Sequence, residues 1–256
     1  MNPAEEMGRN WPLGRGVRVV ATHPAGLIAF EKPAGLMAHP NQPAEEKQAL
    51  VRAPYDLERE CYRIPLADGG TRTVFLLNRI DSPTSGLVLG ATDLQVARAV
   101  RQAFKENEVH KTYFALVKGG RLQPPRGRWI DRLARRKIGA TVRMGVGAGG
   151  VPAATDFLWR RSGGKKDAPV SLLELFPLTG RTHQLRVQCA AHRAPIVGDK
   201  TYGDFGFNRR VVAAGSADRL FLHAAALELV FPWKGREEKF RAESPLPESF
   251  AALLDG

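Results

Sequence analysis

A carboxylate with an arginine two residues before it stands in a segment that could support chemistry. Asp81 lies in residues 78–86, a turn-like stretch rich in hydroxyl groups and glycine that follows a short apolar run, and Arg79 precedes it. A carboxylate fixed at the end of a strand can act as a nucleophile or a base when a nearby cation keeps it ionised. The alternative is that Asp81 caps the turn through its own backbone.

Two further segments carry groups suited to chemistry. Gly180 can form a tight turn before a helix, which places Arg181 near the helix start, where its forked guanidinium can reach a carboxylate. Lys111 and Tyr113 share one face of a predicted strand. The phenol could stack on a base and move a proton. The alternatives are a solvated arginine and an aromatic side chain at the rim or in the core.

Other patterns exclude several classes of chemistry. Residues 145–150 have the glycine spacing of a dinucleotide-binding loop, but no convincing strand leads in and Pro152 stands where a helix should begin, so we predict a flexible loop. The six histidines lack metal-binding spacing, and we expect no metal. The motif of a serine hydrolase is absent. Cys61 and Cys189 form no CxxC pair, which favours a reducing compartment.

The charge balance favours a polyanionic partner. The 256 residues include 38 Lys and Arg against 26 Asp and Glu, a formal charge of +12, which indicates nucleic acid before membrane. Eight basic residues and one acid fall within 121–143. We predict that this basic stretch is exposed, partly β, and contacts phosphates. The alternative is a solvated basic loop. With no apolar run near the ~18–20 residues of a membrane span and no signal peptide, we expect a soluble, cytoplasmic protein.

The elements that must position these residues form an α+β fold. Residues 1–16, polar and rich in Gly and Pro, are predicted to be a loose lead-in. Leu94, Ala97, Val100, Ala103 and Phe104 follow helical spacing, with Thr92 or Asp93 as the helix cap. Other helices are predicted at 182–191 and 246–254. Strands are predicted at 17–21, 27–30, 74–77, 87–89, 112–117 and 171–176, and 220–231 is an apolar run.

Six segments, in order, resemble the RluA/TruC-type pseudouridine synthases. They are Glu31-Lys-Pro-Ala-Gly with His39, Arg79-Ile-Asp-Ser-Pro-Thr-Ser-Gly86, Lys111-Thr-Tyr-Phe-Ala115, Gly180-Arg-Thr-His-Gln-Leu-Arg186, Pro195-Ile-Val-Gly-Asp-Lys-Thr-Tyr-Gly203 and Leu222-His-Ala224. The resemblance runs from about residue 18 to 245. It implies a single catalytic domain over 17–256, with a central mixed, mostly antiparallel sheet, flanking helices and a basic cleft.

The resemblance also implies a reaction and its residues. A uridine in structured RNA, ribosomal RNA or tRNA, would flip out of its stack and be isomerised to pseudouridine without a cofactor. Asp81 matches the nucleophile, Tyr113 the tyrosine that stacks on the base, and Arg181 the arginine that pairs with the carboxylate. Leu185 would form a wall of the uracil pocket, and Arg79 would fill the gap left by the flipped base.

The remaining expectations concern RNA binding, the oligomeric state and the alternative functions. We expect substrate contacts from Lys111, and from Arg135, Arg136 and Lys137 in the basic stretch, which would replace the S4 RNA-binding domain that relatives often carry. A monomer is expected. Asn78 and Gln188 depart from the family pattern, where histidine is usual, and should alter supporting contacts only. The main alternative is a non-catalytic RNA-binding protein on the same fold; an unrelated hydrolase using Asp81 is disfavoured.

Overall fold

The computed structural model describes residues 11–138 and 141–256. The chain forms two compact units, each described by itself below. The first unit comprises residues up to His110 together with Ala224–Ser244, and the second comprises Lys111–His223 together with Pro245–Gly256. Both combine antiparallel strands with a few helices, which confirms the predicted α+β class. Within the described part of the chain, none of the helices is long and apolar enough to cross a membrane.

The first unit is built on antiparallel strand pairs. Its elements are β1 (Arg18–Thr22), β2 (Leu27–Lys32), the 3-10 helix η1 (Pro43–Gln48), β3 (Tyr55–Asp56), β4 (Cys61–Pro65), β5 (Thr71–Leu76), β6 (Ser85–Ala91), α2 (Leu94–Glu106), most of β12 (Leu222–Trp233) and β13 (Arg236–Glu243). The strand order is β3-β4-β5-β6-β12, while β2 pairs with β1 and β6, and β13 pairs with β12. Strand β6 is buried along its whole length, so the residues before it are firmly anchored.

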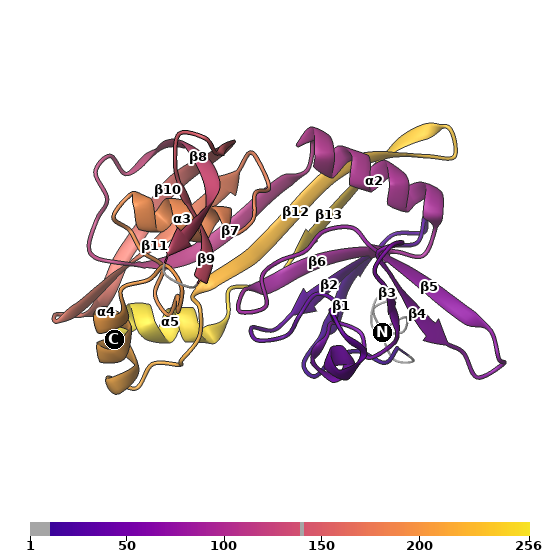
Figure 1. The fold of residues 1–256 in the computed structure, drawn as a ribbon, viewed down its shortest axis with the longest axis horizontal. Helices are drawn as coiled ribbons and strands as arrows, with labels where there is room; N and C mark the ends of the chain where they lie inside the picture. Colours follow the sequence, from indigo (N-terminus) through magenta and orange to yellow (C-terminus); the bar gives the residue numbers. More distant parts are fainter. Residues whose placement is uncertain (1–10, 139–140) are drawn as a thin grey trace. The chain divides into compact units, whose positions relative to one another are not determined.

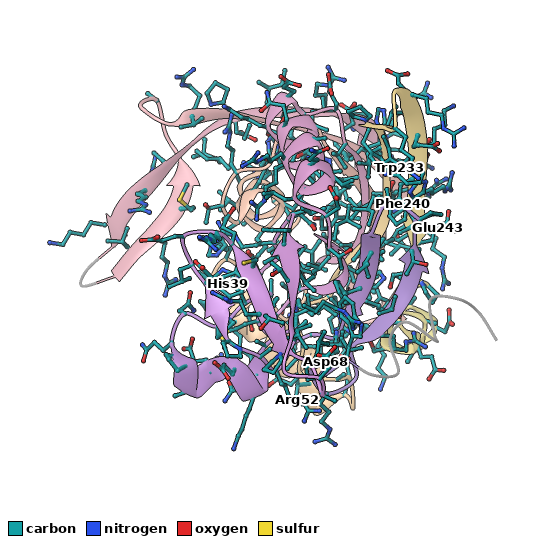
Figure 2. The ribbon with its side chains drawn as sticks, turned by 90° about the vertical axis from the view of Figure 1, so that its right-hand side faces the viewer. His39, Arg52, Asp68, Trp233, Phe240 and Glu243 are labelled. Carbon is teal, nitrogen blue, oxygen red and sulfur yellow. The ribbon has the colours of Figure 1, made fainter. Side chains whose placement is uncertain are left out.

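Helix α2 covers one face of these strands. The carboxylate of Asp93 accepts a hydrogen bond from the backbone N–H of Val96 at 2.9 Å, so Asp93 is the predicted cap. The buried side chains are Val96, Ala97, Val100 and Ala103, which pack against β2, β6, β12 and β13. The expectation that Leu94 belongs to the buried face was wrong, because its side chain is 42% exposed. In Figure 1 α2 crosses β12 and β13, and Figure 2 marks Trp233 and Phe240 on that hairpin.

The second unit is a sheet with helices on both faces. Its elements are β7 (His110–Lys118), β8 (Arg126–Ile138), β9 (Thr141–Val146), β10 (Val151–Lys165), β11 (Ala168–Pro177), α3 (Gln184–Ala191), α4 (Phe205–Ala213) and α5 (Glu248–Asp255). The strand order is β7-β11-β10-β8-β9, with antiparallel registers. Alternation along β7 separates the two faces, because Ala115 packs with Leu185 of α3 whereas Leu116 packs with Phe207 of α4 and Phe250 of α5.

Two sequence expectations concern irregular segments. The glycine-rich residues 145–150 end β9 and form its turn into β10, where Gly150 donates to the carbonyl of Gly147 at 2.9 Å. A strand therefore does lead in, contrary to expectation, but a strand and not a helix follows. Of the predicted lead-in, residues 1–10 lie outside the described residues; Trp11 is buried and Leu13 pairs with Val51 in the first unit.

Candidate active site

Asp81 lies in the turn between β5 and β6 of the first unit. The backbone carbonyl of Asp81 accepts a hydrogen bond from the N–H of Thr84 at 2.9 Å, which closes the turn. Three residues earlier, the side-chain oxygen of Asn78 accepts from the N–H of Leu89 in β6 at 2.6 Å. The half-buried Asp81 is therefore held between two backbone anchors. Asn78, a departure from the family pattern, supports the turn through its side-chain amide.

A buried lysine fastens this turn to a second loop. The ammonium of Lys32, whose side chain is fully buried, lies within 2.7–3.0 Å of the carbonyl oxygens of Pro33, Leu36, Ser82 and Thr84. An ammonium has three N–H donors, so the four carbonyl oxygens share them. Two of these carbonyls come from the loop after β2 and two come from the Asp81 turn. Lys32 thus crosslinks the two loops electrostatically.

Sequence reasoning placed Lys32 in a motif but gave it no role. Its only sequence signal is the Lys32-Pro33 pair at the end of a predicted strand, and burial of a lysine is not visible in a sequence. The same two loops are joined further by Gly35, whose N–H donates to the Ser82 carbonyl at 2.8 Å, and by the Ser82 hydroxyl, which donates to the Gly35 carbonyl at 3.0 Å.

Gly86 is required at the start of β6 because of its neighbour. Its φ is +111°, a conformation that side chains rarely adopt, and an added Cβ would lie 2.1 Å from the carbonyl oxygen of Ala224. The backbone of β6 therefore approaches that of β12 directly. This contact, within the first unit, fixes the strand that follows the Asp81 turn.

Arg79 is exposed but guided by neighbours. Its Nη1 lies 3.2 Å from Nε2 of His39 and 3.8 Å from a carboxylate oxygen of Glu60. The His39 ring, marked in Figure 2, stacks on Tyr55 with 4.8 Å between ring centroids. His39 appeared only as a motif residue in the sequence, and the structure shows that it orients Arg79.

Arg181 lies in the second unit, in the loop from β11 to α3, as predicted. Its Nε donates to the carbonyl of Pro152 at 3.1 Å, and its backbone N–H donates to the side-chain oxygen of Gln184 at 3.0 Å. The buried Gln184 also donates to the carbonyl of Ala154 at 3.0 Å and to the Thr155 hydroxyl at 2.9 Å. The loop that carries Arg181 is thereby bound to the start of β10.

Tyr113, Lys111 and Leu185 gather at the same end of the second unit. Tyr113 on β7 is paired with Leu175 near the end of β11 and packs against the apolar cluster that contains Leu185. Lys111 lies two residues before Tyr113, and its ammonium is 3.5 Å from the carbonyl of Thr179 in the Arg181 loop. Burial lowers the pKa of Lys111. The start of β7 therefore carries a phenol that packs in the cluster of Leu185 and an ammonium that contacts the backbone of the Arg181 loop.

A polar network supports this part of the second unit. The Tyr202 hydroxyl lies 2.8 Å from Nδ1 of His183 and accepts from the N–H of Met144 in β9 at 3.2 Å. The Arg186 guanidinium contacts the face of the Tyr202 ring, 5.2 Å from its centroid. The motif around residues 195–203 thus connects the β8–β9 hairpin to the residue that precedes α3. Sequence reasoning quoted Tyr202 within that motif and gave it no role.

Gln188, the second departure from the family pattern, is fully buried. Its side-chain oxygen accepts from the Thr155 hydroxyl at 2.6 Å, and its amide nitrogen donates to the Asp131 carboxylate at 2.8 Å. Asp131 also lies 3.0 Å from Nε2 of His192. Gln188 therefore satisfies buried polar groups between α3 and the sheet.

The basic stretch forms the β8–β9 hairpin. Arg135, Arg136 and Lys137 are exposed on β8, and their neighbours across the hairpin are Met144, Arg143 and Val142. Part of the stretch is therefore β and exposed, as predicted. Residues 139 and 140, and the side chains of residues 138 and 141, lie outside what the structure describes.

The site residues fall into two groups. Asp81 and Arg79 belong to the first unit, whereas Tyr113, Lys111, Arg181, Leu185 and the basic stretch belong to the second. Among residues 11–138 and 141–256, no group of three His, Cys, Asp or Glu side chains is arranged to hold a metal ion. The predicted site residues comprise a carboxylate, a phenol, an apolar side chain and several cations.

Comparisons with known proteins identify the family. A family model described as RNA pseudouridylate synthase matches residues 26–191. The tRNA pseudouridine synthase C of Vibrio cholerae serotype O1 is 34% identical over 235 residues, 89% of this chain and 91% of that protein. The protein of the same name from Pectobacterium carotovorum is 30% identical over 236 residues, 86% of this chain and 57% of that protein.

A relative with another name and a solved structure agree. The ribosomal large subunit pseudouridine synthase D of Xanthomonas campestris is 32% identical over 239 residues, 89% of this chain and 66% of that protein. The solved structure titled "Human RNA Pseudouridylate Synthase Domain Containing 1" has a TM-score of 0.68 and 26% identity, covering 94% of this chain and 88% of that one. The chain therefore belongs to the RNA pseudouridylate synthase family, the enzymes that convert uridine in RNA to pseudouridine.

Proposed function

We propose that this protein converts a specific uridine of tRNA to pseudouridine. The observation that carries the choice of tRNA is the relative named tRNA pseudouridine synthase C, which is matched over 91% of its length. Ribosomal RNA is the second candidate, because the relative named for the ribosomal large subunit is similar at 32% identity. The protein is proposed to act as a monomer in the cytoplasm.

The proposed chemistry uses Asp81, Tyr113 and Arg181. Asp81 acts as the nucleophile or initiates cleavage of the glycosidic bond, Tyr113 stacks on the uracil and takes part in proton transfer, and Arg181 pairs with the carboxylate. Support comes from the anchoring of two of these groups: the Asp81 turn is closed by Thr84, and the Arg181 backbone is bound by Gln184. A nucleophile needs this kind of fixed geometry, because misplacement of the reacting atoms is costly in rate.

Four parts of the protein are proposed to bind the substrate. Leu185 forms an apolar wall for the uracil, and Lys111 offers a cation beside Tyr113. Arg79, oriented by His39, fills the space that the flipped uridine vacates. The hairpin cations Arg135, Arg136 and Lys137 contact phosphates, a proposal supported by their exposure.

Substitution of the carboxylate tests the reaction. Asp81→Asn keeps the size and the backbone of the turn but removes the anion. We expect pseudouridine formation on unmodified bacterial tRNA transcripts to fall below detection, while the far-UV circular dichroism and the RNA affinity stay within twofold of the wild type. Turnover retained at more than a few per cent would contradict the role of Asp81.

A parallel assay tests the choice of substrate. Wild-type protein is incubated with tRNA transcripts and with large-subunit rRNA transcripts, and pseudouridines are mapped. Modification of rRNA alone would transfer the proposal to ribosomal RNA, and binding of both RNAs without any modification would favour the non-catalytic alternative.

A further inference from the structure

One face of β8 displays a row of arginines, of which the proposed site uses only Arg136. Residues of a strand alternate between two faces, so Arg126, Arg128, Ile130, Arg132 and Arg136 lie on one face, called here the outer row. The other face carries Trp129 and Leu133, which are buried beneath α3, and Asp131, which binds Gln188. Between residues 126 and 133, only the outer row is therefore available to a partner.

The guanidinium groups of the outer row are held in place by other groups. Arg128 forms two hydrogen bonds to the Asp156 carboxylate, at 2.5 and 2.8 Å. Arg132, whose side chain is exposed, donates through Nε to the carbonyl of Ala148 at 3.1 Å. Arginines restrained in this way lose less side-chain entropy when they bind an anion.

The glycines at the end of β9 and in the turn that follows it lie beside the Arg136 side chain. A Cβ added at Gly145 would lie 2.9 Å from Cδ of Arg136, and one added at Gly147 would lie 2.7 Å from its Nη2. The Arg136 side chain therefore lies across two residues that have no side chain of their own. The glycine spacing that resembled a dinucleotide-binding loop thus leaves room for the guanidinium of Arg136.

The charge and spacing of the outer row fit the backbone of a nucleic acid. Side chains two residues apart on a strand are separated by about 6.8 Å, comparable with the distance between successive phosphates of an RNA strand. The carboxylates of the strands on this side of the sheet include Asp156, bound by Arg128, and Glu174, bound by Arg160 at 2.6 Å; on the same side, Asp255 of α5 is bound by Arg161 at 2.9 Å. Along the outer row itself, the four arginines therefore lie beside a single strand carboxylate, that of Asp156.

An exposed apolar side chain interrupts the arginines. Ile130 is 73% exposed, the most exposed of the large apolar residues described, and lies between Arg128 and Arg132. An apolar residue among cations suits the alternation of charged phosphate with ribose and base in RNA.

We infer that the outer row binds the sugar–phosphate backbone of the RNA substrate, with the arginines on phosphates and Ile130 on a ribose or base, outside the uridine that reacts. The inference rests on the proposed function, since it requires an RNA substrate. It adds Arg126, Arg128, Ile130 and Arg132 to the RNA-binding residues and extends the contact from the hairpin tip along the strand.

The test compares two variants with equal loss of charge. Arg126→Gln/Arg132→Gln alters the outer row, and Arg98→Gln/Lys105→Gln removes two exposed positive charges from α2. Affinity for bacterial tRNA and rRNA transcripts is measured from low to high salt, with the Asp81→Asn change in every protein so that no turnover occurs. Each lost phosphate contact should reduce the slope of log affinity against log salt by about 0.7–0.9, so the outer-row variant should lose roughly 1.5 and the α2 variant close to none. Equal slopes in the two variants would overturn the inference.

A second comparison isolates Ile130. Ile130→Ala should weaken binding several-fold at every salt concentration without changing the slope, because an apolar contact releases no counterions. Leu94→Ala, an exposed apolar residue on α2, is the matched control and should leave binding unchanged. Equal RNA affinities of the Ile130→Ala and Leu94→Ala proteins would show that Ile130 is not part of the RNA-binding surface. If the wild type modifies rRNA alone, the tRNA proposal fails, and a changed slope on rRNA would still support the outer row.

Discussion

The guanidinium of Arg186 and the carboxylate of Asp199 form a buried two-point ion pair, with Nε–Oδ2 and Nη2–Oδ1 distances of 2.8 and 2.9 Å. The same carboxylate accepts from the backbone N–H groups of Thr201 and Tyr202, at 2.8 and 3.0 Å. Burial opposes ionisation of Asp199, but the Arg186 guanidinium and these N–H donors outweigh it and lower its pKa. The pair fixes the turn that carries Tyr202.

The first prediction concerns the pH dependence of this pair. A carboxyl with a lowered pKa in the folded state contributes stability above its unfolded value of about 3.9 and loses it as the pH falls through the folded value. Asp199→Asn should lower the free energy of unfolding at pH 7 by about 3–5 kcal/mol, because the buried Arg186 loses the carboxylate that balances its charge. The difference between the two proteins should narrow below pH 4. Urea unfolding of the two proteins at pH 7 and below pH 4 measures this difference in unfolding free energy. A difference that does not change with pH would contradict the lowered pKa of Asp199.

The second prediction concerns Lys32. Lys32→Met removes the ammonium that holds four carbonyls of the two loops beside Asp81, and should cost about 2–5 kcal/mol of unfolding free energy. Loosening of the turn should also lower the single-turnover rate at saturating RNA by tenfold or more. Lys47→Met, the same change at an exposed lysine of η1, is the control. A stable Lys32→Met protein with the wild-type rate would show that the crosslink has no role in placing Asp81.

The third prediction separates stability from function at Lys111. Burial lowers the pKa of this ammonium, and the contact described for it is a carbonyl at 3.5 Å. Below its folded pKa the buried charge is destabilising, and the penalty disappears as the pH rises through that value towards the unfolded value of about 10.4. Lys111→Met should therefore be as stable as the wild type at pH 7, or more stable by about 1 kcal/mol. The stability difference should shrink towards pH 10.

The same Lys111→Met variant should weaken substrate affinity if the ammonium contacts RNA. Equilibrium binding of tRNA transcripts at pH 7 would show it. Loss of stability together with unchanged affinity would assign Lys111 to folding alone.

The fourth prediction concerns the hairpin tip. Neutralising Arg135, Arg136 and Lys137 to Gln should reduce the slope of log RNA affinity against log salt by roughly 2.1–2.7 if all three contact phosphates. An unchanged slope would mean that these charges serve solubility only. Because the three side chains are exposed, the change in unfolding free energy should stay within about 0.5 kcal/mol.

Prediction from the sequence succeeded where periodicity and capping agree. Helix α2 was recognised from its apolar spacing and its Asp93 cap, and β2, β7 and β11 from short apolar runs. Strand β10 was missed because Pro152 and the pair Gly163-Gly164 interrupt its pattern, although their neighbours complete the pairing with β11. Helix α4 was missed because it buries only Phe207 and Val211.

The candidate site was predicted unevenly for a physical reason. Asp81, Tyr113 and Arg181 stay predictions that rest on segments matching family motifs, whereas the position of Arg181 near a helix start was anticipated from Gly180. Lys32, His39 and Tyr202 act through partners that lie far away in the chain, such as Ser82, Arg79 and Met144. Spacing along a single sequence does not carry such long-range contacts.

The path of the chain makes the two units inseparable by a single cut. Residues 224–244 return to the first unit, where Leu227, Phe231 and Phe240 complete the core beneath α2, and the last helix then returns to the second, where Phe250 and Leu254 complete another. A stop codon or protease cut near residue 223 would therefore strip apolar core from both units at once. Half-length fragments of this enzyme should accumulate as proteolysis-sensitive chains, and exchange of modules between relatives would have to replace two separate segments together.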